Sequence, residues 1–301
     1  MAEASGTARG LSDAEIERLA RARGGLRRHL WALCAGVVLF LVIACAILAG
    51  ILAPHDPRAP NVLANLLPPS FEPEFGETFL LGTDAIGRDV LSVILYGARL
   101  SLAVGVASVL GAGVIGTLIG VFAGYFRGWT EETIMRLVDI QMAFPFILLA
   151  IIIMFVLGHG FGNVVAVLIV TTWPMYARVA RAETLRLRDS EYVLAARVAG
   201  AGSLRIIFRH ILPNSLTPII IIATAAVPQM IILEAALSFL GVGLPPDEPS
   251  WGGLLAAGRG YLSQGWWIAT FPGIAIMLTV LSINILGDWL RDQLDPNLKD
   301  S

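Results

Sequence analysis

The sequence predicts an all-α, polytopic membrane protein with about six transmembrane helices and both termini in the cytoplasm. Hydrophobic residues make up 56% of the 301 residues and charged residues 15%, whereas a soluble chain carries about 25% charged residues. Six apolar runs approach the roughly 20 residues that a helix needs to cross the hydrocarbon core. Arginines gather on alternate connections between these runs. Together these observations predict a chain whose apolar surface faces lipid.

The candidate spans follow one another along the chain, and each is too long for a strand of a membrane barrel. Residues that break or end helices bound them: Pro54 follows the first span, Pro213 opens the fifth and Asp288 follows the sixth. Pro145 and Pro228 predict kinks in the third and fifth spans. The predicted spans are residues 31–53, 100–125, 140–157, 161–180, 213–233 and 266–286.

The arginines predict the orientation of the chain in the membrane. Residues 1–30 and 183–212 are rich in arginine, whereas residues 54–99 carry more acidic than basic side chains, so the positive-inside rule places the first two in the cytoplasm. The N-terminal region mixes acidic residues with its arginines and has no convincing signal-peptide cleavage site, so the first span is expected to remain as an anchor. The predicted organisation is a cytoplasmic arginine-rich leader (1–30), a first transmembrane helix (31–53), an extracytoplasmic loop with an interfacial helix (54–99), a five-helix core (100–290) that contains the loop 183–212, and a cytoplasmic tail (291–301).

Three glycines in the second span predict close helix packing. Gly116, Gly120 and Gly124 are four residues apart and share one helix face, where a neighbouring helix can approach closely. A moving gate is the alternative interpretation.

Few ionisable residues lie inside the spans. Asp139 and Glu234 are expected to cap a helix or pair with a neighbouring span, with a direct transport role as the alternative.

The chain lacks the residue patterns of an enzyme. It has no HExxH zinc motif, and none of its four histidines lies beside a plausible nucleophile. Cys34 and Cys45 are interpreted as small packing residues. The only lysine is Lys299, and a P-loop requires a Gly-rich turn followed by Lys and Ser or Thr. We therefore expect no catalytic residue, cofactor or metal on this chain, and any ATP that drives it binds to another subunit.

An unusual segment of the outer loop runs from Gly82 to Asp89. Its two glycines and two aspartates predict a structured turn, and Asp89 is placed to cap a helix that starts at Val90. The apolar stripe that follows predicts an interfacial helix ahead of the second span. A structural turn and a surface that touches an external partner both stay open. The residues concerned are Gly82, Thr83, Asp84, Gly87, Arg88 and Asp89.

The cytoplasmic loop 183–212 is predicted to hold two short helices. The first covers residues 191–199, with Gly200 at its C′ position. The second is capped by Ser203 and ends at residues 212–214. Because the first helix carries small side chains ringed by arginine, it is predicted to dock a partner. The docking candidates are Glu191, Tyr192, Leu194, Ala195, Ala196, Arg197, Gly200, Ala201 and Gly202.

These two segments carry a resemblance to a known family. The family motif is Glu-Ala-Ala, three residues, Gly, nine residues, then Ile-x-Leu-Pro. The spacing is kept here by Leu194-Ala195-Ala196, Gly200 and His210-Ile211-Leu212-Pro213. Leu194 stands where the family has Glu, and His210 where it has Ile. With the outer segment 82–89 and Phe144-Pro145, residues 30–298 resemble the permease subunits of ABC importers, in the DppC/OppC-like half of the dipeptide/oligopeptide/nickel branch.

The resemblance implies an ABC type I importer permease fold in the bacterial cytoplasmic (inner) membrane. It implies a homologous DppB/OppB-like permease, one or two ABC ATPase subunits that hold ATP and Mg²⁺ and dock on the helix at 190–202, and an extracytoplasmic peptide-binding protein. No nucleic-acid partner is expected. The implied solutes are di- and oligopeptides, with nickel chelates, glutathione or antimicrobial peptides as alternatives. A stand-alone secondary carrier would need broken inverted repeats or midplane acids, which the sequence does not clearly show.

Overall fold

The described part of the chain folds into helices joined by turns and loops. The computed structural model describes residues 13–73 and 76–294. Within these residues the strand geometry is limited to isolated bridges, such as the one between Thr83 and Asp89. The elements are α1 (Asp13–Ile47), α2 (Ala49–Leu52), η1 (Val62–Ala64), α3 (Val90–Phe126), α4 (Gly128–Met142), α5 (Phe146–Leu157), α6 (Phe161–Arg188), α7 (Glu191–Val198), α8 (Ser203–Ile206), the π-helical η2 (Ile207–Ile211), α9 (Leu212–Phe239), α10 (Trp251–Gly258), η3 (Arg259–Tyr261) and α11 (Trp266–Leu294).

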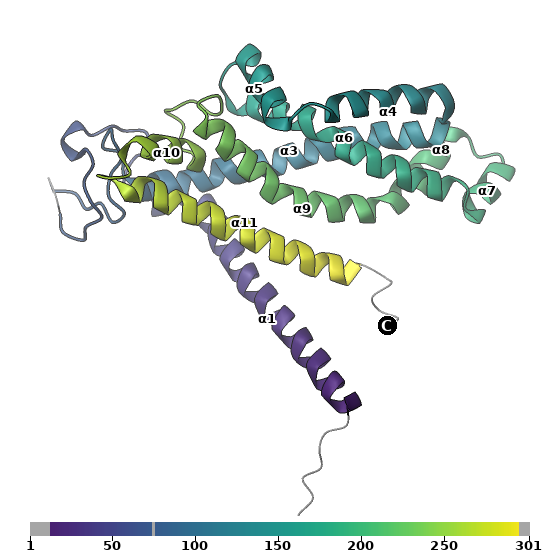
Figure 1. The fold of residues 1–301 in the computed structure, drawn as a ribbon, viewed down its shortest axis with the longest axis horizontal. Helices are drawn as coiled ribbons and strands as arrows, with labels where there is room; N and C mark the ends of the chain where they lie inside the picture. The colour runs from purple at the N-terminus through teal and green to yellow at the C-terminus, as the bar shows by residue number, and fades with distance from the viewer. Residues whose placement is uncertain (1–12, 74–75, 295–301) are drawn as a thin grey trace, which may run out of the picture.

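The long helices lie along one axis of an elongated bundle (Figure 1). α3, α6, α9 and α11 run along this axis, while α1 diverges from the bundle. α10 and the loop that precedes α3 lie at one end, and α7 and α8 lie at the other. The two segments that the sequence singled out are therefore at opposite ends of the molecule.

Among the described residues, five helical stretches are long and apolar enough to span a membrane: those in α1, α3, α6, α8 through α9, and α11. A sixth candidate span is formed by α4 and α5 together, which are bent by 92° at the break between them. The predicted all-α fold with about six spans is confirmed. α3 has 37 residues, or about 55 Å at 1.5 Å per residue. It is therefore much longer than the hydrocarbon core of about 30 Å.

The third predicted span, residues 140–157, is not one helix. α4 ends at Met142 and α5 begins at Phe146, after Pro145 with an extended ψ of 125°. Because a proline ring disfavours helical geometry in the preceding residue, the helix stops ahead of Pro145. The sequence predicted a kink at this proline, and the structure has a near-perpendicular turn instead.

The interfacial helix predicted within residues 54–99 is not a separate element. Residues 90–99 are the first turns of α3. The predicted N-cap is confirmed, because the Asp89 carboxylate accepts the Ser92 N–H at 2.9 Å. The outer loop therefore ends at Asp89, and the apolar stripe after it belongs to a membrane-spanning helix.

The second predicted loop helix does not end at residues 212–214. α8 continues through the π-helical turn of η2 into α9, so that Ser203–Phe239 is one candidate span. Pro213 lies in the first turn of α9, and the π-helical turn before it accommodates the proline, which has no N–H to donate. The predicted boundary at Pro213 therefore falls inside a continuous helical path.

The backbones of α3 and α6 are in direct contact along the glycine face of α3. A Cβ atom added at Gly116 would lie 2.4 Å from the carbonyl oxygen of Trp173, and one at Gly120 would lie 2.2 Å from that of Ala177. At Gly124 the corresponding distance to the Arg181 carbonyl oxygen is 2.8 Å. Any larger residue at these positions would force the helices apart.

Ion pairs hold α4 against α6. Asp139 accepts a hydrogen bond from the Arg178 guanidinium at 2.6 Å, and Glu131 pairs with Arg181. The expectation that Asp139 pairs with a neighbouring span is confirmed. Nearer the break, the Trp173 indole N–H donates to the Gln141 side-chain oxygen at 3.0 Å.

Glu234 links α9 to α3 inside the bundle. Its side chain is fully buried. One carboxylate oxygen accepts the Ser101 hydroxyl at 3.0 Å, and the other accepts the Ser238 hydroxyl at 2.9 Å. Since a buried acid without hydrogen bonds is costly, these two serines account for its place in the packing.

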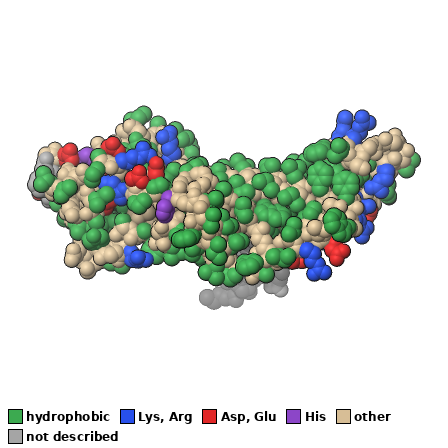
Figure 2. Space-filling view, turned by 90° about the horizontal axis from the view of Figure 1, so that it is seen from above, with side chains coloured by type: hydrophobic (Ala, Val, Ile, Leu, Met, Phe, Trp, Pro, Cys, Tyr) green, Lys and Arg blue, Asp and Glu red, His purple; other side chains and the backbone are tan. Residues whose placement is uncertain are grey.

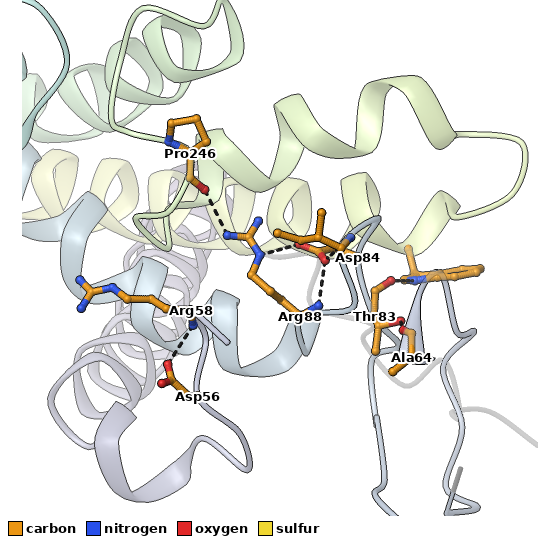
Figure 3. A network of polar contacts seen from close by, with 9 residues as sticks. Asp56, Arg58, Ala64, Thr83, Asp84, Arg88 and Pro246 are labelled. Atoms are coloured by element: carbon orange, nitrogen blue, oxygen red, sulfur yellow. Dashed lines mark hydrogen bonds and ion pairs between the residues drawn. The ribbon is translucent and has the colours of Figure 1, made fainter. Parts of the chain in front are cut away.

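The outer segment folds around a buried ion pair (Figure 3). Asp84 accepts the backbone N–H groups of Ile86 at 3.0 Å and Arg88 at 2.9 Å, and its second oxygen accepts the Arg88 guanidinium at 2.7 Å. Arg88 also donates to the Pro246 carbonyl at 3.1 Å, which ties the turn to the loop between α9 and α10. Both side chains of the pair are nearly inaccessible to solvent.

Thr83 connects the same turn to two further segments. Its hydroxyl donates to the Ala64 carbonyl and accepts the Leu67 N–H at 2.8 Å, while its carbonyl accepts the Trp267 indole N–H at 3.0 Å. Gly87 has a φ of +80°, and a Cβ there would lie 1.8 Å from the Asn61 carbonyl oxygen. The turn is thus the structural centre of the outer loop.

Gly120→Ala is expected to lower the thermal unfolding midpoint of the purified protein in detergent. The added Cβ would overlap the Ala177 carbonyl, and overpacking of this kind typically costs about 1–3 kcal/mol. Gly113→Ala is the matched control on the same helix, because its Cβ would lie 3.7 Å from the Tyr176 ring, an ordinary contact. Equal midpoints for the two variants would contradict the close α3–α6 contact.

Arg88→Met is expected to destabilise the protein by about 3–5 kcal/mol, because it leaves the buried Asp84 carboxylate without its cation. Arg58→Met removes an exposed ion pair with Glu248 and is expected to cost less than about 1 kcal/mol. Thermal unfolding of both variants measures the difference. A midpoint for Arg88→Met no lower than that for Arg58→Met would show that the buried pair does not hold the outer loop.

Candidate functional site

α7 is a short helix that presents most of its surface to the outside of the molecule, at the end opposite the outer loop (Figure 1). Val193 is fully buried and anchors the helix, while Val198 is 90% exposed. Leu204, just after α7, is 61% exposed. Of the docking candidates, Ala196 and Ala201 are half-buried and the following are exposed: Glu191, Tyr192, Leu194, Ala195, Arg197, Gly200 and Gly202.

Arg188 fastens the start of α7 to the end of α3. Its guanidinium donates to the Tyr125 carbonyl at 2.7 Å and lies 3.4 Å from the Gly124 carbonyl. These carbonyls belong to the last turn of α3, where acceptors have no intrahelical partner. The Ser190 hydroxyl donates to the Leu187 carbonyl at 2.5 Å across the junction between α6 and α7. α7 is therefore tied to the ends of both central helices.

Gly200 ends α7 in a Schellman motif. It lies at the C′ position with a φ of +84°. Its N–H donates to the Arg197 carbonyl at 3.0 Å, and the Ala201 N–H donates to the Ala196 carbonyl at 3.0 Å. Only glycine adopts this backbone conformation without strain. The turn returns the chain toward α8 and leaves Val198 at the tip.

Three basic side chains on and after α7 have no acidic partner in the described part of the chain, whereas Arg186 and Arg188 before it pair with Glu183 and Asp189. Arg197, Arg205 and Arg209 are exposed and form no ion pair there. Figure 2 shows blue side chains, with red ones among them, at both ends of a molecule whose middle is largely hydrophobic. The surface combines exposed apolar groups with three unpaired arginines, and it also carries the exposed carboxylate of Glu191.

The other predicted site residues lie elsewhere. All six predicted residues of the outer turn are buried, and the exposed residue between Gly82 and Asp89 is Ile86. Their geometry therefore matches the structural-turn interpretation. The three glycines lie between the two ends, against α6. The structure does not bring these sets together into one site.

Sequence reasoning missed the role of Arg188, which was counted only among the cytoplasmic arginines. No spacing rule links a side chain in one helix to the last carbonyls of another, so no sequence signal marked it. Among residues 29–73 and 76–293 no group of His, Cys, Asp or Glu side chains is arranged to hold a metal ion. Cys34 and Cys45 are both free thiols.

Comparison with known proteins assigns the family. The model of the family described as "Binding-protein-dependent transport system inner membrane component" matches residues 116–300. The model described as "N-terminal TM domain of oligopeptide transport permease C" matches residues 18–69. Together they cover α1 and the helices from the middle of α3 to α11.

Curated relatives match over nearly the whole chain. The di/tripeptide transport system permease protein DppC of Pseudomonas aeruginosa is 43% identical, with 87% of each chain covered. The dipeptide transport system permease protein DppC of Escherichia coli is 43% identical over 91% of each chain. The glutathione transport system permease protein GsiD of Pectobacterium atrosepticum is also 43% identical, over 91% of this chain and 89% of that one.

Solved structures share the helical arrangement. An inward-facing conformation of the MetNI methionine ABC transporter superposes with a TM-score of 0.56 and 20% identity, covering 67% of this chain and 96% of the other. Identity at that level shows the fold alone, whereas the family models and relatives extend to the sequence. The chain therefore belongs to the binding-protein-dependent transport system inner membrane components, as a DppC/OppC-like permease of an ABC importer.

Proposed function

We propose that this chain and a homologous permease together form a pathway for peptides across the bacterial inner membrane, powered by separate ATPase subunits that dock on α7. Both termini then lie in the cytoplasm, as the arginine distribution predicts. The observation that carries the proposal is α7 itself. α7 exposes Val198, and the exposed Arg197, Arg205 and Arg209 lie on or just after this helix. Arg188 hydrogen-bonds to the end of α3 at the junction of α6 and α7.

The attachment of α7 explains how the work of ATP reaches the membrane. This chain has no P-loop, so nucleotide-driven closure must occur on a partner. When a partner that binds α7 changes shape, α7 moves and the ends of α3 and α6 move with α7, because hydrogen bonds at Arg188 and Ser190 join the three helices. Transport follows when the partner binds the inward- and outward-facing states with different affinity.

The solute is proposed from the relatives. DppC of Pseudomonas aeruginosa and DppC of Escherichia coli are named for di/tripeptide and dipeptide transport, and GsiD for glutathione transport. Peptide transport is the broader of these activities. We assign di- and oligopeptides to this chain, delivered by an extracytoplasmic peptide-binding protein, with glutathione as the alternative. Nickel chelates and antimicrobial peptides are further alternatives within the branch.

A stand-alone secondary carrier is the second candidate, and the break between α4 and α5 is the observation that favours it. Broken helices line the binding sites of many such carriers. The position of Glu234 argues against a carrier. This buried acid hydrogen-bonds to Ser101 and Ser238 and does not line the cavity at the break between α4 and α5. A carrier also leaves the exposed surface of α7 without a role.

Purification with native partners tests the proposal. The tagged chain is extracted from its own membrane in mild detergent, its partners are identified by mass spectrometry, and the complex is reconstituted into liposomes. We expect a second permease, one or two P-loop ATPases, and uptake of a tritium-labelled dipeptide that requires ATP. A chain that purifies without an ATPase and transports along an ion gradient would establish the carrier instead.

Gly200→Val is expected to uncouple ATP hydrolysis from transport in the reconstituted complex. A residue with a left-handed backbone costs about 1–2 kcal/mol more when it carries a side chain, and a β-branched one is the least tolerated. The end of α7 should therefore unwind, and dipeptide uptake should fall several-fold while the complex still assembles and hydrolyses ATP. Gly260→Ala is the control, because it has open space around it. Wild-type uptake by Gly200→Val would remove α7 from the coupling path.

A further inference from the structure

A cavity of about 660 Å³ lies where the chain leaves α2, against the first turns of α3 and the loop between α9 and α10. We refer to it as the outer cavity. Its volume is within the 300–1,000 Å³ that is usual for small-molecule sites. The residues that line it include Gly50, Asp56, Arg58, Tyr96, Arg99 and Glu248.

The outer cavity lies at the level where the first span ends. α2, which ends at Leu52, completes the apolar stretch of α1, and the polar segment 54–58 follows it. Arg99 comes nine residues after Val90, the first residue of α3, so it lies about 14 Å along that helix. Since α3 is about 25 Å longer than the hydrocarbon core, a position this far along it is close to the edge of the core. Lipid headgroups lie at the same level.

The lining of the outer cavity offers both a free cation and a free acid. Arg58 pairs with Glu248 at 2.8 Å, and one carboxylate oxygen of Asp56 accepts the Arg58 backbone N–H at 2.9 Å (Figure 3). The exposed Arg99 guanidinium makes no hydrogen bond or ion pair within the described residues. The Tyr96 hydroxyl and the second oxygen of Asp56 also have no partner in that part of the chain. These groups can bind a ligand that carries an anion and a cation together.

An exposed apolar stripe runs from the outer cavity along α3. Ala103, Val106, Leu110 and Val114 follow Arg99 at intervals of three or four residues, so they share its helix face. Val106 is 46% exposed, Leu110 62% and Val114 59%. From Arg99 to Val114 the stripe is about 22 Å long, whereas one leaflet contributes about half of the 30 Å hydrocarbon core. The stripe is therefore long enough for an acyl chain of one leaflet.

α1 packs beside the stripe without covering it. Val42 and Ala46 of α1 share an apolar cluster with Ala98 and Leu102 of α3. These two α3 residues lie on the helix face next to the stripe. The α3 surface thus has a charged group at the membrane edge, an apolar face that leads from it toward the middle of the membrane, and a helix that borders this face. A phospholipid has the matching order of polar and apolar parts.

We propose that the outer cavity binds the headgroup of a phospholipid that carries a primary ammonium group, such as phosphatidylethanolamine. Arg99 and Tyr96 bind its phosphate, since a guanidinium matches the geometry of phosphate oxygens. Asp56 binds its ammonium group, and one acyl chain lies along the stripe. The proposed orientation puts this lipid in the outer leaflet. The site itself does not depend on the solute that is transported.

The charges of the lining favour this headgroup over others. Arg58 and Arg99 balance Asp56 and Glu248, and a zwitterionic headgroup keeps that balance. Phosphatidylglycerol supplies a phosphate but no ammonium group for Asp56. The quaternary ammonium of phosphatidylcholine has no N–H to donate to a carboxylate. A zwitterionic peptide has both charges but no acyl chain for the stripe.

Native mass spectrometry measures lipid binding to the full chain, together with the partners that purify with it. The protein is delipidated in mild detergent and titrated with phosphatidylethanolamine, phosphatidylglycerol or phosphatidylcholine of equal chain length. We expect phosphatidylethanolamine to bind most tightly and Arg99→Gln to weaken its binding about tenfold, the loss typical of one hydrogen bond to a charged group. Arg259→Gln is the matched control, because Arg259 is an exposed arginine just after α10 that does not line the cavity.

Asp56→Asn tests the ammonium contact separately. The amide oxygen of asparagine can still accept the Arg58 N–H, so the local turn is kept while the negative charge is lost. We expect phosphatidylethanolamine to lose its advantage over phosphatidylcholine in this variant, and phosphatidylglycerol to bind at least as well as in the wild type. An unchanged preference for phosphatidylethanolamine would overturn the assignment of its ammonium group to Asp56.

A crosslink from the stripe tests what covers it. Cys34 and Cys45 are replaced by serine, and a benzophenone maleimide is attached to Ala103→Cys, at an exposed residue that lines the cavity. Irradiation in membranes should add the mass of phosphatidylethanolamine to this chain. A crosslink to a second permease would overturn the proposal, because the stripe would then be a subunit interface. If Arg99→Gln fails to fold, this crosslink decides.

Three further results would overturn the lipid site. The first is equal binding of phosphatidylethanolamine by the wild type and Arg99→Gln. The second is displacement of the lipid by a millimolar dipeptide, which would make the cavity a peptide site. The third is binding of glycerophosphoethanolamine, the same headgroup without acyl chains, as tight as that of the lipid. None of these measurements requires transport, so they are independent of the proposed function.

Discussion

The contact between the backbones of α3 and α6 is the constraint on which the rest of the structure depends. At Gly116, Gly120 and Gly124 a single added carbon atom would overlap carbonyl groups of α6. Packing this close brings many atoms of the two helices into van der Waals contact. In a bilayer the hydrophobic effect does not drive helices together, so such contacts are a main driving force of their association. It also fixes the axial register of the two helices, because each glycine faces one particular carbonyl.

The register of α3 and α6 sets the positions of the outer loop at one end of the molecule and of α7 at the other. At the outer end, Asp89 caps α3 and the buried Asp84–Arg88 pair fixes the loop around it. At the other end, Arg188 of α6 reaches the last carbonyls of α3 and sets the position of α7. Hydrogen bonds from Arg188 and Ser190 thus join α7 to the α3–α6 pair. The ion pairs of α6 hold α4 in place, and the break that follows α4 bounds a cavity between α4, α5, α6 and α9.

The sequence predicted the helical class, the approximate spans and the Asp89 cap because those depend on local composition and on one side chain near its own backbone. It did not predict the 92° turn after α4. Pro145 marks a break, but the angle depends on the ion pairs that hold α4 against α6. The burial of Arg88 depends on the distant Pro246 carbonyl. The cavity at the break between α4 and α5 takes its lining from four helices, and a hydropathy pattern does not show which helices are neighbours. The roles of the α7 residues stay predictions, since their partner is another chain.

The most direct measurement is a photo-crosslink from α7 in the assembled complex. Cys34 and Cys45 are first replaced by serine, and a benzophenone maleimide is attached to the Val198→Cys variant, whose native side chain is 90% exposed. The matched control is Val156→Cys, at a residue 79% exposed on α5. We expect a crosslink to a P-loop ATPase from position 198 and none from position 156. A complex in which position 198 reaches no ATPase would contradict docking on α7.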